Sequence, residues 1–150
     1  MSRVEAFTLH NANGESVLAS EITKWGLKEG RVFNVTSYSW IVDGCTFHVK
    51  KNDYWIEFPD ASGFICFRSG FTPDGCYVLD AYAKARYTLT VPWELTPYKV
   101  PPDAKMWFRN VGSHPDGQFG VTAWIEFAGD FYFELDYHEG RFLWGKEIRF

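Results

Sequence analysis

Apolar and polar side chains alternate along several stretches of this chain, and turn-forming residues interrupt them about every 8–12 residues. The alternation is clearest in residues 119–127 and 131–137. Successive side chains of a strand point to opposite faces of its sheet, so this period is typical of strands with one buried face. Short strands that recur at this spacing are typical of β-sandwiches and barrels.

The composition agrees with this pattern. Aromatic residues make up 19% of the 150 residues, and flat rings pack well across the strands of a pleated sheet. We therefore predict an all-β fold, an antiparallel barrel or curved β-sandwich of about 8–10 strands with at most one or two short helices. Residues 1–150 are expected to form a single domain, because a chain of this length buries about 70% of its unfolded surface.

Turn and cap residues position the predicted elements. Asn13-Gly14 lies between two apolar stretches and predicts a first hairpin. Apolar residues at helical spacing predict a short helix within residues 20–29. Residues 76–91 alternate and favour one long strand over a helix at 80–87. Four prolines in residues 92–103 exclude a central strand there, and we interpret this segment as a loop that caps one end of the sheet.

The predicted strands have two faces of different chemistry. One face is apolar and is the predicted core; it comprises Tyr54, Ile56, Phe58, Ala104, Met106, Phe108, Phe119, Val121, Ala123, Ile125, Phe127, Phe131, Phe133, Leu135 and Tyr137. The other face, called here the mixed face, interleaves aromatic rings with charged groups; it comprises Trp55, Glu57, Lys105, Trp107, Arg109, Trp124, Glu126, Tyr132, Glu134 and Asp136. So many large aromatic side chains beside carboxylates exceed the ordinary scatter of apolar residues on a surface.

The mixed face leaves several interpretations of function open. It could line a barrel cavity that binds a small, partly apolar molecule, with cofactor-free isomerase, cyclase or lyase chemistry as an extension; lipocalin-like proteins and small barrel cyclases are the fold-level analogy. It could be an aromatic platform for sugars in a carbohydrate-binding or glycan-cleaving module. It could be the surface of a non-enzymatic interaction protein of the immunity kind, because Trp, Tyr and Arg anchor interfaces. A loop or helix could also simply cover half of it.

A short acidic stretch carries one resemblance to a known family. Glu134-Leu135-Asp136-Tyr137-His138-Glu139 has the spacing Glu-x-Asp-x-x-Glu, and it resembles the catalytic motif of the jelly-roll β-glucanase and laminarinase family of glycoside hydrolases. The resemblance implies a nucleophilic Glu134, an assisting Asp136 and an acid/base Glu139. It covers six residues, and Glu139 precedes Gly140 in a predicted turn.

Three carboxylates, Glu126, Glu134 and Asp136, are the predicted catalytic residues. We expect them to alternate on adjacent strands of one hairpin, where cross-strand neighbours lie about 5 Å apart and repel each other. Repulsion and desolvation would raise the pKa of at least one, as proton transfer near neutral pH requires. The predicted ligand-binding residues are Trp55, Glu57, Trp107, Arg109, Trp124 and Tyr132. The sequence does not decide between binding and turnover, or whether the chain self-associates.

Charge and motif content argue against other classes of function. The formal net charge is −4 and the basic residues are scattered, which argues against nucleic-acid binding. No apolar run reaches the ~18 residues of a membrane span. Three unpatterned cysteines and an N-terminus without an apolar stretch predict a cytoplasmic protein with reduced thiols. The four histidines lack metal-ligand spacing and no glycine-rich phosphate loop is present, so we expect neither a metal nor a cofactor.

Overall fold

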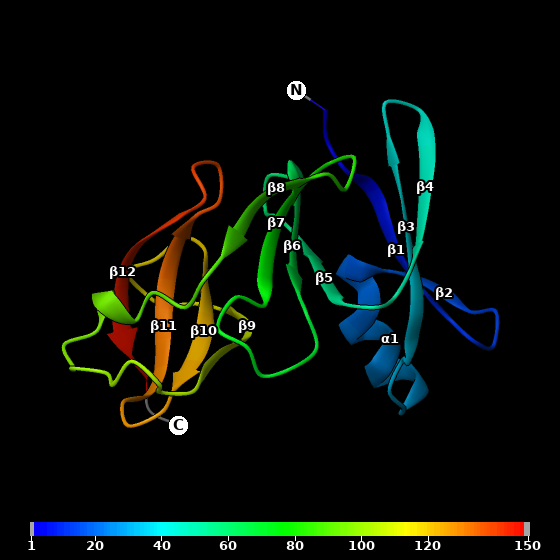
Figure 1. Cartoon of the computed structure of the whole chain (residues 1–150). Helices are drawn as coiled ribbons and strands as arrows, with labels where there is room; N and C mark the ends of the chain where they lie inside the picture. Colours follow the sequence, from blue (N-terminus) through cyan, green and yellow to red (C-terminus); the bar gives the residue numbers. More distant parts are fainter. Residues whose placement is uncertain (1, 149–150) are drawn as a thin grey trace. The chain divides into compact units, whose positions relative to one another are not determined.

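A computed structural model describes residues 2–148 of the chain. Those residues form twelve strands in three antiparallel four-stranded sheets, together with one α-helix (Figure 1). The strand orders are β2-β1-β3-β4, β5-β6-β7-β8 and β12-β11-β10-β9. The chain divides into two compact units, one of residues 1–64 and 79–84, the other of residues 65–78 and 85–150.

The prediction of an all-β fold with few helices is confirmed, and the barrel alternative is not. Each of the three sheets of residues 2–148 has two edge strands, whereas a barrel needs its first and last strands to pair. The fold is of the sandwich-like all-β kind. No helix in the described part of the chain is long and apolar enough to cross a membrane.

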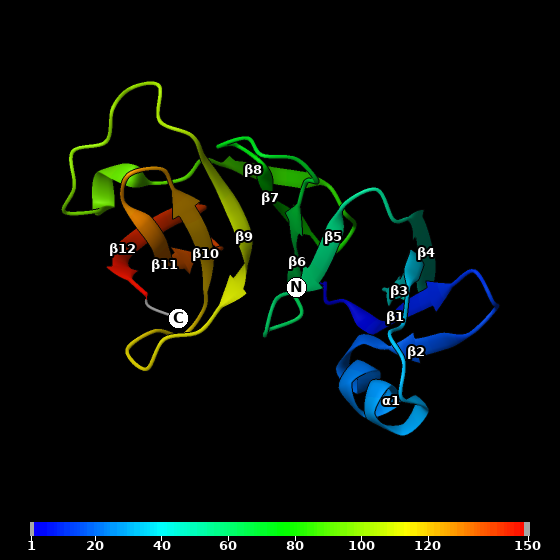
Figure 2. The same cartoon turned by 90° about the horizontal axis from the view of Figure 1, so that it is seen from below.

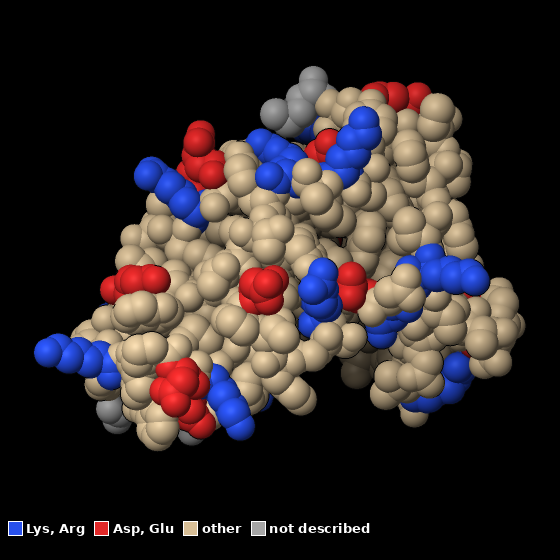
Figure 3. Space-filling view, viewed as in Figure 1, with Lys and Arg blue, Asp and Glu red and all other residues tan. Residues whose placement is uncertain are grey.

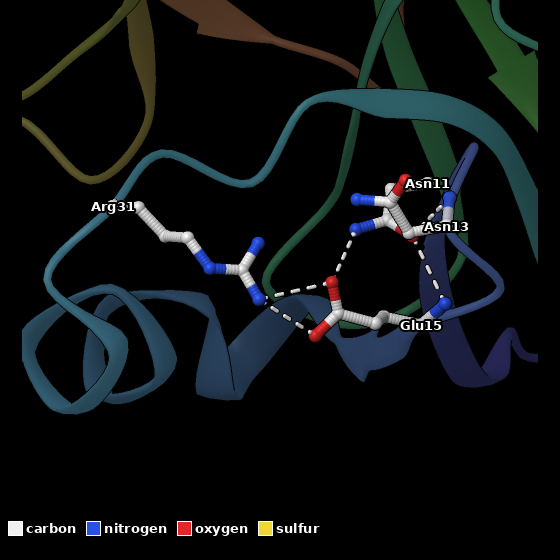
Figure 4. A network of polar contacts seen from close by, with 4 residues as sticks. All are labelled: Asn11, Asn13, Glu15 and Arg31. Carbon is white, nitrogen blue, oxygen red and sulfur yellow. Dashed lines mark hydrogen bonds and ion pairs between the residues drawn. The ribbon is translucent and has the colours of Figure 1, made fainter.

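The first unit begins with the predicted hairpin. Its first sheet comprises β1 (Glu5–Asn11), β2 (Ser16–Leu18), β3 (Val35–Val42) and β4 (Cys45–Lys50). In the turn between β1 and β2, Asn11 Oδ1 accepts the N–H groups of Asn13 and Glu15 at 3.1 and 2.9 Å. The Glu15 carboxylate in turn accepts bonds from the Asn11 amide at 3.0 Å and from Arg31 at 2.9 and 3.0 Å (Figure 4).

The predicted helix is also present in the first unit. A 3-10 turn, η1 (Ala19–Glu21), leads into α1 (Ile22–Glu29), and Gly30 ends the helix with a φ of 67°. Glycine adopts this left-handed conformation at little cost, which is why it commonly follows the last helical residue. The helix therefore lies within the predicted residues 20–29 and ends immediately before Gly30.

Large rings fill the core of the first unit. The Phe64 ring centroid lies 5.0 Å from that of Phe7, 4.9 Å from that of Trp40 and 5.2 Å from that of Trp55. Trp55, expected on the mixed face, therefore joins this aromatic cluster, whereas Tyr54, expected in the core, is exposed. Both belong to β5 (Tyr54–Glu57). Apolar residues at consecutive positions of a strand do not indicate which of its two faces is buried. The sequence therefore could not predict which side chains of β5 point into the core.

The third sheet contains β5, β6 (Gly63–Phe67), β7 (Cys76–Asp80) and β8 (Ala85–Leu89). Residues 76–91 are thus neither one strand nor a helix: a turn separates β7 from β8. Asp80 Oδ1 accepts the N–H groups of Tyr82 and Lys84, both at 2.9 Å, and Ala83 has a φ of 63°. An Asp side chain that bonds to the backbone two residues on stabilises a turn, and this local signal outweighs the alternation.

The second unit contains the sheet made of β9 (Met106–Gly112), β10 (Gly120–Ile125), β11 (Gly129–Asp136) and β12 (Arg141–Glu147). Its apolar face is the predicted core: Val121, Ala123, Ile125, Phe131, Phe133 and Leu135 are all buried. Phe127 is a correction, because it is 78% exposed with a φ of 72°. β10 ends at Ile125, so Phe127 lies in the turn before β11 and the alternation no longer applies to it.

Residues 90–105 connect β8 to β9 and include the 3-10 turn η2 (Trp93–Leu95). The whole segment lies within the second unit, so it does not join one unit to the other. Tyr98 from this segment packs edge-on against Phe131 of β11, with 6.1 Å between the ring centroids.

Candidate functional site

The mixed face of the sheet β12-β11-β10-β9 is the part of the predicted site that the structure keeps together. Strand register aligns its residues in rows. Trp124 of β10 lies opposite Trp107 of β9 on one side and Asp130 of β11 on the other. Two residues further along, Thr122 lies opposite Tyr132, and after that Gly120 lies opposite Glu134. The two ends of this face have different surroundings.

The end that carries Trp124 is partly open to solvent. The Trp107 and Trp124 rings pack on each other with 4.5 Å between centroids and 36° between planes. The Phe71 ring packs on Trp107 at 4.7 Å and is itself 77% exposed. Together with Arg109 and Asp130, these rings are called here the aromatic patch.

A β-bulge shapes the aromatic patch. The register of β9 and β10 shifts between Thr122 and Ala123, whose partners are Asn110 and Phe108, so Arg109 is the extra residue. A bulge redirects a side chain away from the regular pleat. Arg109 Nη1 donates to Asp130 Oδ1 at 2.8 Å, so that the ion pair spans from β9 to β11 across the strand that carries Trp124.

The other end of the mixed face is covered by the segment between β9 and β10. The Tyr132 hydroxyl donates to Glu134 Oε1, and the Gln118 N–H donates to Glu134 Oε2 at 2.9 Å. The His114 ring stacks on Tyr132 at 5.5 Å and meets the Trp144 ring edge-on at 5.3 Å. Tyr132 and Glu134 are both buried as a result. We call these five residues the covered cluster.

Two glycines leave the space in which the Tyr132 and Glu134 side chains of the covered cluster pack. A Cβ at Gly117 would lie 2.4 Å from Glu134 Oε1, and one at Gly120 would lie 2.4 Å from Tyr132 Cζ. Burial raises the pKa of the Tyr132 hydroxyl, and its hydrogen bond to the Glu134 carboxylate raises that pKa further. Tyr132 therefore stays protonated and acts as a donor that holds Glu134 in place.

The three predicted catalytic carboxylates do not converge. Glu126 lies in the turn after β10, where its Oε1 accepts the Lys105 N–H at 3.2 Å. Asp136 ends β11 and accepts the N–H groups of His138 and Glu139, both at 3.1 Å. Glu126 and Asp136 are at opposite ends of the hairpin, about eight residues apart along β11, or roughly 26 Å at the rise of an extended strand. Glu134 and Asp136 share a strand, and Glu134 belongs to the covered cluster.

The remaining predicted ligand-binding residues are divided between the units. Trp107, Arg109, Trp124 and Tyr132 belong to the second unit, and Trp55 and Glu57 belong to the first. Burial raises the pKa of the Glu57 carboxyl above its usual value. Among residues 2–148, no group of three or more His, Cys, Asp or Glu side chains is arranged to hold a metal ion.

Sequence reasoning missed Phe71, Asp130, His114 and Trp144. Phe71 lies outside the predicted strands, and a turn residue gives no indication of the surface it will cover. His114-Pro115-Asp116-Gly117 was identifiable only as a turn. Asp130 has a signal that could have been used, because the alternation of β11 continues back to it from Tyr132.

Within residues 2–148, the fold and this face define an all-β protein with three open antiparallel sheets and an aromatic surface on one of them. No protein-family model matches the sequence, and no curated protein matches it. Among solved structures, the chain is similar to a chain in the structure of Tne2 in complex with Tni2. The TM-score is 0.74 at 12% sequence identity, and the match covers 97% of this chain and 99% of that chain. This similarity is one of fold.

Proposed function

We propose that this chain is a non-enzymatic interaction protein of the immunity kind, which acts in the cytoplasm by binding another protein and neutralising it. The observation that carries the proposal is the similarity of fold, over nearly the full length of both chains, to a chain from a complex of two proteins. The matched chain has this fold and comes from a complex of two proteins. It is therefore a precedent for the interpretation as an interaction protein and not for the other interpretations.

The contacts of the mixed face support the same proposal. Glu134 and Asp136 hold backbone segments in place, as does Glu126, which accounts for these carboxylates without catalysis. Trp107 and Trp124 pack on each other, so neither ring offers both of its faces to a sugar. The exposed Phe71 and the Arg109–Asp130 ion pair add the residue types that anchor protein interfaces.

The surface charge and the thiols fit this role. Acidic and basic side chains are interspersed on the face seen in Figure 3 and do not gather there by sign, unlike a surface that tracks phosphates. Cys45 and Cys76 are free thiols, which suits a reducing compartment.

The test is complex formation with a defined protein. A protein that neutralises a second protein has to be present whenever that second protein is made. We therefore choose as probes the products of the two genes that flank the gene for this chain. We expect light scattering after gel filtration to show a one-to-one complex with one of these products, and co-expression to relieve any growth arrest that this product causes.

Tryptophan fluorescence of the free chain separates the competing interpretations. A flat hydrophobic dye and a set of oligosaccharides are titrated in parallel. We expect neither to give a saturable response. If neither flanking product binds, the proposal fails; a saturable response to the dye would then support a small-molecule site, and one to oligosaccharides alone would support a carbohydrate-binding module.

A further inference from the structure

Residues 90–105 are the part of the second unit that departs furthest from regular structure. In Figure 2 the segment runs outward from the end of β8 and turns back to enter β9. It contains Pro92, Pro97, Pro101 and Pro102. Each proline fixes its own φ and restricts the residue before it, so the segment has few backbone conformations to lose when it binds.

Local hydrogen bonds restrict the segment further. The Leu95 N–H donates to the Pro92 carbonyl at 2.9 Å, and the Thr96 N–H donates to the Trp93 carbonyl at 3.0 Å. The Thr96 hydroxyl donates to the same carbonyl at 2.8 Å. Near the other end, the Ala104 N–H donates to the Pro101 carbonyl at 3.0 Å.

The segment is also attached to its own unit at two points. The Val91 N–H donates to the Pro73 carbonyl at 2.9 Å, and the Val91 side chain is buried. The Tyr98 hydroxyl donates to Glu147 Oε2 of β12 at 2.9 Å. A loop with fixed ends and an internally bonded turn is preorganised, and preorganisation lowers the entropic cost of association.

This restricted loop exposes large apolar side chains. Trp93 is 39% exposed, Leu95 is 38% exposed and Tyr98 is 42% exposed. Removing such side chains from water would favour folding, yet the loop leaves them partly exposed. Trp and Tyr are the residue types most enriched among interface residues that dominate binding energy. Glu94, between Trp93 and Leu95, is exposed as well.

We infer that residues 92–98, called here the proline loop, insert into an apolar cleft of the partner protein that carries a basic side chain. The proline loop is attached to the sheet through Tyr98 and presents Trp93, Glu94 and Leu95 to solvent, so a concave site fits it. Trp93 and Leu95 would fill the apolar part of the cleft, and the exposed Glu94 would meet the basic group, in keeping with the net charge of −4. The inference rests on the proposed function and names the surface through which the complex forms.

The test uses the full chain and the flanking gene product that binds it. Leu95→Ala is compared with Leu143→Ala, because Leu143 is a similarly exposed leucine, 46%, on β12 of the same unit. We expect Leu95→Ala and Trp93→Ala to weaken binding by about tenfold or more, and Leu143→Ala to leave it within about twofold. Glu94→Gln should reduce the dependence of the association rate on salt.

Hydroxyl-radical footprinting of the parent chain needs no variant and covers the case in which Trp93→Ala does not fold. Oxidation of Trp93 and Tyr98 should fall when the complex forms. If the parent binds while Leu95→Ala and Leu143→Ala bind alike and this oxidation is unchanged, the inference is wrong and the proposed function stands. If the parent binds neither flanking product, both are wrong.

Discussion

Glu134 shows at the scale of a single residue why a carboxylate in a conspicuous pattern need not be catalytic. It is a buried charged side chain, and such a group has to be hydrogen-bonded to be tolerated. Tyr132 and Gln118 supply the donors, and the second of them comes from the segment between β9 and β10. The carboxylate therefore attaches that segment to the sheet.

Removing the Tyr132 hydroxyl tests this role. Tyr132→Phe leaves the buried Glu134 with one donor fewer, so we expect the free energy of unfolding to fall by about 1–3 kcal/mol. The control is Tyr82→Phe, which removes an exposed hydroxyl that donates to Asp43 and should lower the free energy of unfolding less than Tyr132→Phe does. Urea unfolding measures both. Equal midpoints for the two variants would show that burial of the pair contributes nothing.

Glu57 gives a pH dependence of known sign. Burial raises the pKa of its carboxyl in the folded protein, so the native state holds the proton to a higher pH than the unfolded chain. This contribution to stability is complete below about pH 4.3, the unfolded value, and is lost as the pH rises through the folded pKa.

Glu57→Gln should therefore become progressively more stable relative to the parent between about pH 4.3 and neutral pH. The measurement is urea unfolding of both proteins across this range. Glu5→Gln, which removes a carboxyl at an exposed position of β1, is the control. A difference between Glu57→Gln and parent that does not change with pH would contradict the assignment.

At the scale of elements, the alternation predicts facing well only where strands are regular. In β10 and β11 it placed Val121, Ala123, Ile125, Phe131, Phe133 and Leu135 correctly in the core. It missed that Tyr132 and Glu134 are also buried, because the segment between β9 and β10 covers them. It failed at Phe127, where the strand had ended, and at Trp55, where both faces are apolar. In residues 76–91 it missed the turn that Asp80 stabilises.

Two phenylalanines near each other in sequence test the facing of the last hairpin. Phe133 is fully buried and packs on Phe131 and Phe142, with ring centroids 5.8 and 5.9 Å apart. Phe133→Ala should lower the free energy of unfolding by about 3–5 kcal/mol. Phe127→Ala, at an exposed turn position, should change it by less than about 0.5 kcal/mol. Similar losses in the two variants, measured by urea unfolding, would mean that the facing is inverted.

At the scale of the whole molecule, the division into two units separates residues that the sequence pattern groups together. Trp55-Ile56-Glu57-Phe58 and Trp124-Ile125-Glu126-Phe127 share the same four letters. Trp55 joins the aromatic core of the first unit, whereas Trp124 lies on the aromatic patch of the second. The residues of the predicted mixed face therefore belong to several local structures with different roles. The proposed binding of a partner protein depends on exposed residues instead.

The sequence by itself determined the class of fold, the first hairpin, the short helix and the core face of the last hairpin. These follow from local rules: period-two alternation, turn residues and helix caps act between residues close in the chain. Only the tertiary structure decided that Glu134 is buried beneath the segment of Gln118, that a bulge brings Arg109 to Asp130, and that Trp93, Leu95 and Tyr98 stay exposed. Those outcomes depend on which distant segment covers a side chain, and strand periodicity carries no information about that.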